Sequence, residues 1–86
     1  MGTDFVRMKS MKVPPQIRRK ILSEKLIDTA RVSQEDPAFI FLFDAYSDFV
    51  DTSRELSDFS CMKCRHKVMQ EWKDMKTYLE QLENPK

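Results

Sequence analysis

Apolar residues recur along the chain at intervals of three and four positions, which is the spacing of one face of an α-helix. This pattern predicts three helices, over residues 15–31, 37–55 and 61–83. Gly2 is the single glycine of the chain, so the tight hairpins that a β-rich fold of this size needs are disfavoured. Residues 1–12 follow no clear period. We therefore expect an all-α fold, a three-helix bundle, with a flexible basic N-terminal tail over 1–12 and one helical domain over 13–86.

Local signals mark where the helices begin. Asp36 followed by Pro37 is a typical helix start, because a carboxylate can cap free amides and proline needs no amide partner in the first turn. We expect Ser60 to be the N-cap of the third helix, with Phe59 packing onto Cys64. The first helix has the weakest pattern, since its apolar residues fall on two stripes.

The second and third helices carry more apolar surface than one contact uses. Apolar positions of the second helix cover an arc of about 200°, against about 100° for a single contact. The third helix carries a heptad seam from Cys61 to Leu82, with Trp72 near its middle and Arg65 as its polar member. We expect another chain to bury the surplus, through self-association or a hetero-complex. The predicted partner contacts are Phe41, Phe49, Met62, Met69 and Arg65.

Length and composition narrow the class of protein. A chain of 86 residues is one domain, and so small a core does not favour a deep catalytic cleft. The longest unbroken apolar run, Ala38 to Phe43, is far shorter than a membrane span, and the N-terminus lacks the apolar core of a signal peptide. We expect a soluble intracellular protein, cytoplasmic or part of a virion, with no enzymatic activity, no cofactor and no small-molecule substrate.

Charge is unevenly distributed although the net charge is only +1. Residues 1–25 carry a balance of +5, residues 26–59 of −6, and residues 60–86 of +2. The basic and acidic segments either pair within the chain or form two binding faces. A weak nucleic-acid interface is the other interpretation of the basic segment, although it lacks a helix-turn-helix signature. Its candidate phosphate contacts are Arg7, Lys9, Lys12, Arg18, Arg19 and Lys20.

Cys61 and Cys64 form a CxxC motif at the start of the third predicted helix. A metal site would need His66 as a third ligand, but on a helix His66 points away from both cysteines. A redox pair is favoured by the helix start and by the nearby charges of Lys63 and Arg65, but no strand precedes it. The simplest interpretation is that both cysteines are small core residues.

The string Cys61-x-x-Cys64-Arg65-x-Lys67-Val68-x-x-x-Trp72 resembles strings in short proteins of phages and mobile elements. This resemblance implies a small virion component, an assembly adaptor or an inhibitor of a host factor, and it assigns no functional residues. The leading hypothesis is a non-catalytic helical protein–protein interaction module. The alternatives are a thiol redox or metal-linked protein that uses the CxxC motif, and a weak nucleic-acid binder.

Overall fold

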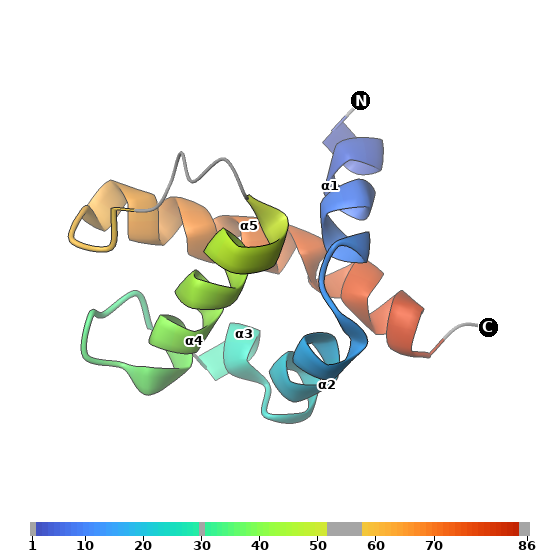
Figure 1. Cartoon of the computed structure of the whole chain (residues 1–86), viewed down its shortest axis with the longest axis horizontal. Helices are drawn as coiled ribbons and strands as arrows, with labels where there is room; N and C mark the ends of the chain where they lie inside the picture. Colours follow the sequence, from blue (N-terminus) through green and yellow to red (C-terminus); the bar gives the residue numbers. More distant parts are fainter. Residues whose placement is uncertain (1, 30, 52–57, 85–86) are drawn as a thin grey trace.

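The computed structural model describes residues 2–29, 31–51 and 58–84. Helices make up most of these residues, and the described ranges contain no strand, so the predicted all-α class is confirmed. The elements are α1 (Gly2–Met11), α2 (Pro15–Ser23), α3 (Leu26–Thr29), α4 (Pro37–Ala45), the π-helical turn η1 (Tyr46–Val50) and α5 (Met62–Glu83) (Figure 1).

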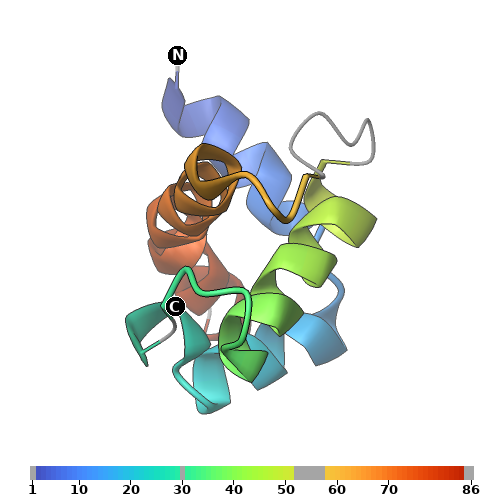
Figure 2. The same cartoon turned by 90° about the vertical axis from the view of Figure 1, so that its left-hand side faces the viewer.

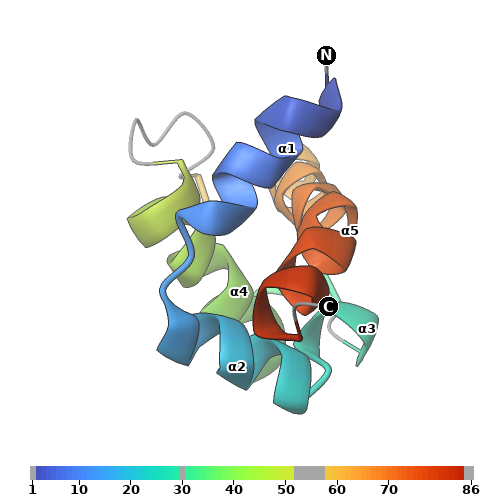
Figure 3. The same cartoon turned by 90° about the vertical axis from the view of Figure 1, so that its right-hand side faces the viewer.

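Helix α5 is the central element. Its 22 residues span about 33 Å, and α1, α2, α3 and α4 all pack against it. The two side views place α1 at one end of the molecule, the α2–α3 pair at the other, and α4 opposite α5 (Figures 2 and 3). The described residues thus form five α-helices, and the predicted three-helix bundle is not confirmed.

Residues 2–11 form helix α1 and are not the predicted tail. Ser10 is fully buried where α1 meets α5, and its hydroxyl donates to the carbonyl oxygen of Val6 at 2.9 Å. Lys9 Nζ lies 3.2 Å from Glu71 Oε2 of α5. The buried face of α1 therefore includes a serine and a lysine stem, which is why it leaves no apolar period in the sequence.

The helix predicted over residues 15–31 is two helices. Lys25 adopts a φ of 53°, in the left-handed region, and this ends α2 and redirects the chain before α3. Ile21 of α2 is buried before the turn, while Leu26 and Ile27 are buried after it. The two apolar stripes of the sequence belong to two differently oriented helices.

The helix predicted over residues 37–55 begins as expected. Asp36 is its N-cap, and Asp36 Oδ1 accepts a hydrogen bond from the Ala38 amide at 2.9 Å. The α-helix gives way to the π turn after Ala45, and residues 52–55 lie outside the described ranges. Helix α4 packs against both α3 and α5, and these two neighbours bury much of the wide apolar arc.

Cys61, and not Ser60, is the N-cap of α5. Phe59 lies against two aromatic rings of α4, with ring centroids 6.0 Å from Phe39 and 5.0 Å from Phe43, and its packing onto Cys64 stays a prediction. From Arg65 to Leu79 the heptad seam is buried inside this one chain, where Trp72 is fully enclosed and its Nε1 donates to the Leu42 carbonyl oxygen at 2.9 Å.

Candidate functional site

The five predicted partner contacts divide into three groups. Met69 and Arg65 are 5% and 7% exposed, so both lie in the interior of this chain. They are therefore not available as the partner contacts that were predicted. Phe41 and Phe49 are half-buried, and the Lys20 ammonium covers the Phe41 ring at 4.6 Å from its centroid. Met62 is 63% exposed and alone among the five presents most of its side chain to solvent.

Arg65 joins two connecting segments of the chain. Its Nε donates to the Val32 carbonyl oxygen at 2.8 Å, and its Nη1 donates to the Phe59 carbonyl oxygen at 2.7 Å. One guanidinium therefore holds the segment before α4 and the segment before α5 in place. Arg65 thus has a structural role within one chain, and its role in the register between two chains stays a prediction.

Helix α1 presents a row of large apolar side chains that the sequence analysis did not identify. Phe5, Met8 and Met11 are 60%, 61% and 61% exposed, and their spacing of three places them along one side of the helix. Exposed Arg7 and Lys12 flank this row. The spacing of three between these residues could have predicted the row, but the prediction of a tail over residues 1–12 left no helix there to carry it. We refer to Phe5, Met8 and Met11 as the α1 row.

The outer side of α4 is acidic. Ile40, 36% exposed, and exposed Asp44 lie one helical turn apart, and exposed Asp48 follows in η1. We refer to Ile40, Asp44 and Asp48 as the α4 acidic face. The carboxylates of this face complement the charges of Arg7 and Lys12 beside the α1 row, and Ile40 offers an apolar contact to the row itself.

The candidate phosphate contacts do not form one free basic stripe. Lys9 pairs with Glu71, and Arg18 Nε lies 2.7 Å from Glu83 Oε2. Arg19 Nε lies 3.8 Å from the other oxygen of Glu83. Several cations of the basic N-terminal segment are therefore neutralised by glutamates of α5, which weakens the nucleic-acid interpretation. Arg7, Lys12 and Lys20 are exposed.

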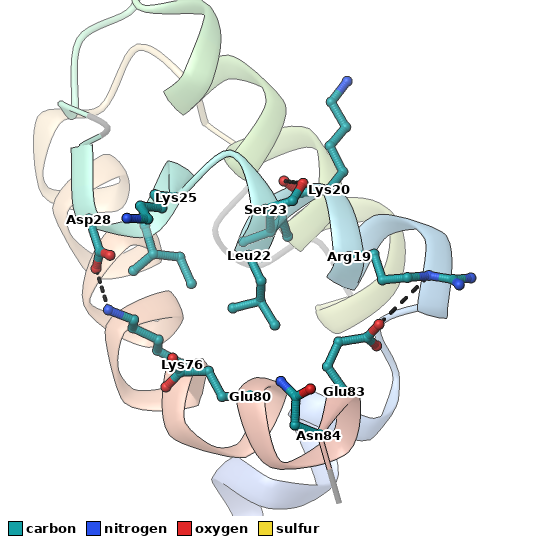
Figure 4. Close-up of a pocket in the computed structure, with 12 residues that line it drawn as sticks. Arg19, Lys20, Leu22, Ser23, Lys25, Asp28, Lys76, Glu80, Glu83 and Asn84 are labelled. Atoms are coloured by element: carbon teal, nitrogen blue, oxygen red, sulfur yellow. Dashed lines mark hydrogen bonds and ion pairs between the residues drawn. The ribbon is translucent and has the colours of Figure 1, made fainter.

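A cleft of about 560 Å³ lies between the α2–α3 pair and the C-terminal part of α5. Leu22 points from α2 toward α5 in the middle of this cleft, while Lys20 points away from it (Figure 4). Ion pairs between Arg19 and Glu83 and between Lys76 and Asp28 cross the cleft on either side of Leu22. Hydrogen bonding to Asp28 raises the pKa of Lys76. The charges at this rim thus satisfy each other, as expected of a packing seam between helices.

A second hollow, a shallow groove of about 920 Å³, follows the outer side of α5 beside the Arg31–Val32 segment. Every charged residue that lines it is basic, and Met62, Met69 and Val32 supply its apolar part. The basic lining residues are Arg31, Lys63, Lys67 and Lys73, together with the titratable His66. The groove therefore favours anionic groups beside the start of α5.

Cys61 and Cys64 lie at the start of α5, and neither of them lines this groove. Both are half-buried, which corrects the prediction that they are core residues. Cys61 Sγ accepts a hydrogen bond from the Cys64 amide at 3.2 Å, so the thiol takes the place that serine or aspartate usually fills at a helix start. The two thiols therefore lie on the same first turn, in contact with solvent.

The environments of the two thiols are unequal. Hydrogen bonds from the Cys64 thiol, and then from the Cys64 amide, lower the pKa of Cys61. The same thiol–thiol hydrogen bond, followed by partial burial, raises the pKa of Cys64. Cys61 is accordingly the thiol that ionises first.

Three broader observations complete the site. Among the described residues, no three His, Cys, Asp or Glu side chains come close enough together to hold a metal ion. No helix in the described ranges has the length and apolar character needed to cross a membrane. Comparisons of the chain with family models, with curated proteins and with solved structures give no match.

Proposed function

We propose that this chain is a non-catalytic helical protein–protein interaction module whose partner is a second copy of itself. The observation that carries the proposal is the α1 row, three large apolar side chains with about three-fifths of each exposed on one short helix. Contiguous apolar surface of this kind is uncommon on monomers and usually marks an interface. The opposite side of α1 already packs on α5, so the row has no further use in this chain's own core.

The α4 acidic face supports a second copy as the partner. Arg7 and Lys12 flank the α1 row, whereas Asp44 and Asp48 accompany Ile40. Docking one face onto the other brings methionines against isoleucine and cations near carboxylates, which favours the correct orientation. Because the two faces differ, the contact is heterologous and produces a ring or an extended chain of copies.

Sedimentation equilibrium of the isolated chain in reducing buffer tests this proposal. We expect concentration-dependent association that weakens as salt rises, because exposed charges are screened. The variant Met8→Ser/Met11→Ser is expected to sediment as a monomer. Met62→Ser is the matched control, since Met62 is equally exposed but lies on α5, outside both faces, and it should associate like the unmodified chain.

A charge exchange tests the pairing of the two faces. Lys12→Glu is expected to weaken association, and Asp44→Lys in the same chain is expected to restore part of it. Far-UV circular dichroism confirms that each variant folds. An unmodified chain that stays monomeric at high concentration and binds no hydrophobic dye would contradict the proposal. If the chain stays monomeric but binds dye through the α1 row, the row would instead be a docking surface for a different protein, and self-association would be wrong.

A further inference from the structure

We propose that Cys61 and Cys64 form a redox-active dithiol that low-molecular-weight disulfides, such as glutathione disulfide, oxidise to an intramolecular disulfide. The inference rests on the geometry of the first turn of α5 and is independent of self-association. Cys61 precedes the helix as its N-cap, and Cys64 donates its amide hydrogen to Cys61 Sγ at 3.2 Å. Both side chains are partly exposed, so a small disulfide has access to them.

The first turn favours Cys61 as the attacking thiol. Free amides and the positive end of the helix dipole stabilise a thiolate at this position. A hydrogen bond from the Lys63 amide also lowers the pKa of Cys61, while the charge of Asp58 opposes its ionisation. Cys61 has the lowered pKa and Cys64 the raised one, so the first supplies the thiolate and the second keeps its proton in reserve.

The reaction is two successive thiol–disulfide exchanges. The Cys61 thiolate attacks one sulfur of the small disulfide, forms a mixed disulfide and releases one small thiolate. Cys64 then loses its proton and attacks the Cys61 sulfur, which releases the second small thiolate. The protein loses two electrons and two protons as its disulfide forms, and the small disulfide is reduced to two thiols.

Mass spectrometry of the chain in mixtures of glutathione and glutathione disulfide tests the proposal. We expect the unmodified chain to lose two hydrogens, with a fraction oxidised that follows the ratio of the mixture. Cys64→Ser should accumulate a glutathione adduct on Cys61, because no resolving thiol remains. Cys61→Ser should form its adduct on Cys64 several-fold more slowly. Far-UV circular dichroism shows whether each variant keeps its helices.

Equal reaction rates of the two single-cysteine variants, with adducts on both cysteines of the unmodified chain and no internal disulfide, would overturn the proposal. That result would leave the two cysteines with a structural role only, Cys61 as the N-cap of α5 and Cys64 as its neighbour in the first turn.

Discussion

At the scale of single residues, Arg65 has the most consequential contacts. Its side chain is buried, yet its two described hydrogen bonds go to backbone carbonyl oxygens, those of Val32 and Phe59, and not to a carboxylate. Buried carbonyl groups that lose a donor retain their desolvation cost. Arg65 therefore stabilises two connecting segments at once, and both segments depend on one side chain.

Arg65→Met is expected to lower the free energy of unfolding by about 1–3 kcal/mol, because the Val32 and Phe59 carbonyl oxygens lose the guanidinium donor and Phe59 keeps only the longer hydrogen bond from Gln34 Nε2 at 3.4 Å. Arg65→Lys should recover only part of the loss, since an ammonium lacks the planar fork of a guanidinium. Urea unfolding followed by circular dichroism measures both. Lys67→Met, two positions away and exposed, is the control. Equal stability of the Arg65→Met and Lys67→Met variants would show that the bonds contribute nothing.

The sequence alone predicts some residues well and others poorly. Trp72 is buried as its mid-seam position indicates, and Asp36 caps α4 as its place before proline indicates. The role of Arg65 was not predictable, because it donates to backbone carbonyl oxygens, and these cannot be recognised from the residue types in the sequence. Cys61 was misplaced because a thiol is a rare N-cap, so the more usual Ser60 took precedence.

At the scale of elements, α1 is the helix that the pattern missed. On α1, Val6, Ser10 and the stem of the Lys9 side chain make the contact with α5. Val6 is the one apolar residue of these three. Ser10 is fully buried, so a larger side chain at this position has no space. The turn at Lys25 was not predictable either, because lysine has no preference for the left-handed conformation that ends α2.

Ser10→Leu is expected to destabilise the chain by about 1–3 kcal/mol, because the added volume overpacks the contact between α1 and α5. Lys12→Leu places the same side chain at an exposed position of the same region and should change stability little. Thermal or urea unfolding of the two variants gives the comparison. If both unfold like the unmodified chain, residues 2–11 do not pack on α5 in solution.

At the scale of the whole molecule, one helix organises the fold. Helix α5 contacts each of the other four α-helices, within principal extents of 39 × 28 × 17 Å. The sequence predicts the fold class and the buried seam of α5, since both follow from the apolar period. It does not predict the arrangement of the remaining helices, because their short lengths leave orientation to tertiary contacts.

Acid stability is a property of the whole molecule that two carboxylates influence. A hydrogen bond from the Arg31 amide, with another from the Ala38 amide, holds the pKa of Asp36 below its ordinary value. The Ser60 hydroxyl and amide lower the pKa of Asp58 in the same way. Since the folded pKa values lie below the unfolded ones, the unfolded chain binds more protons, and the stabilisation is lost as pH falls.

We therefore expect resistance to urea to be nearly constant above about pH 5 and to fall as pH drops below about 4. The variant Asp36→Asn/Asp58→Asn should show a shallower fall, because neither amide side chain titrates. Urea midpoints measured across this range for both proteins make the comparison. Superimposable pH profiles would mean that other carboxylates control acid stability.

The π turn η1 has a consequence for how this protein can vary. A π turn accommodates one residue more than the α-helical turn it replaces, because its hydrogen bonds reach one position further. The Asp51 amide makes such a bond to the Tyr46 carbonyl oxygen at 2.8 Å. Residues 46–50 are thus the natural place for a one-residue deletion: the segment can revert to α-helix while the N-terminal part of α4, with buried Phe39 and Leu42, keeps its register. Length variation in this protein can be absorbed inside a helix as well as in its loops.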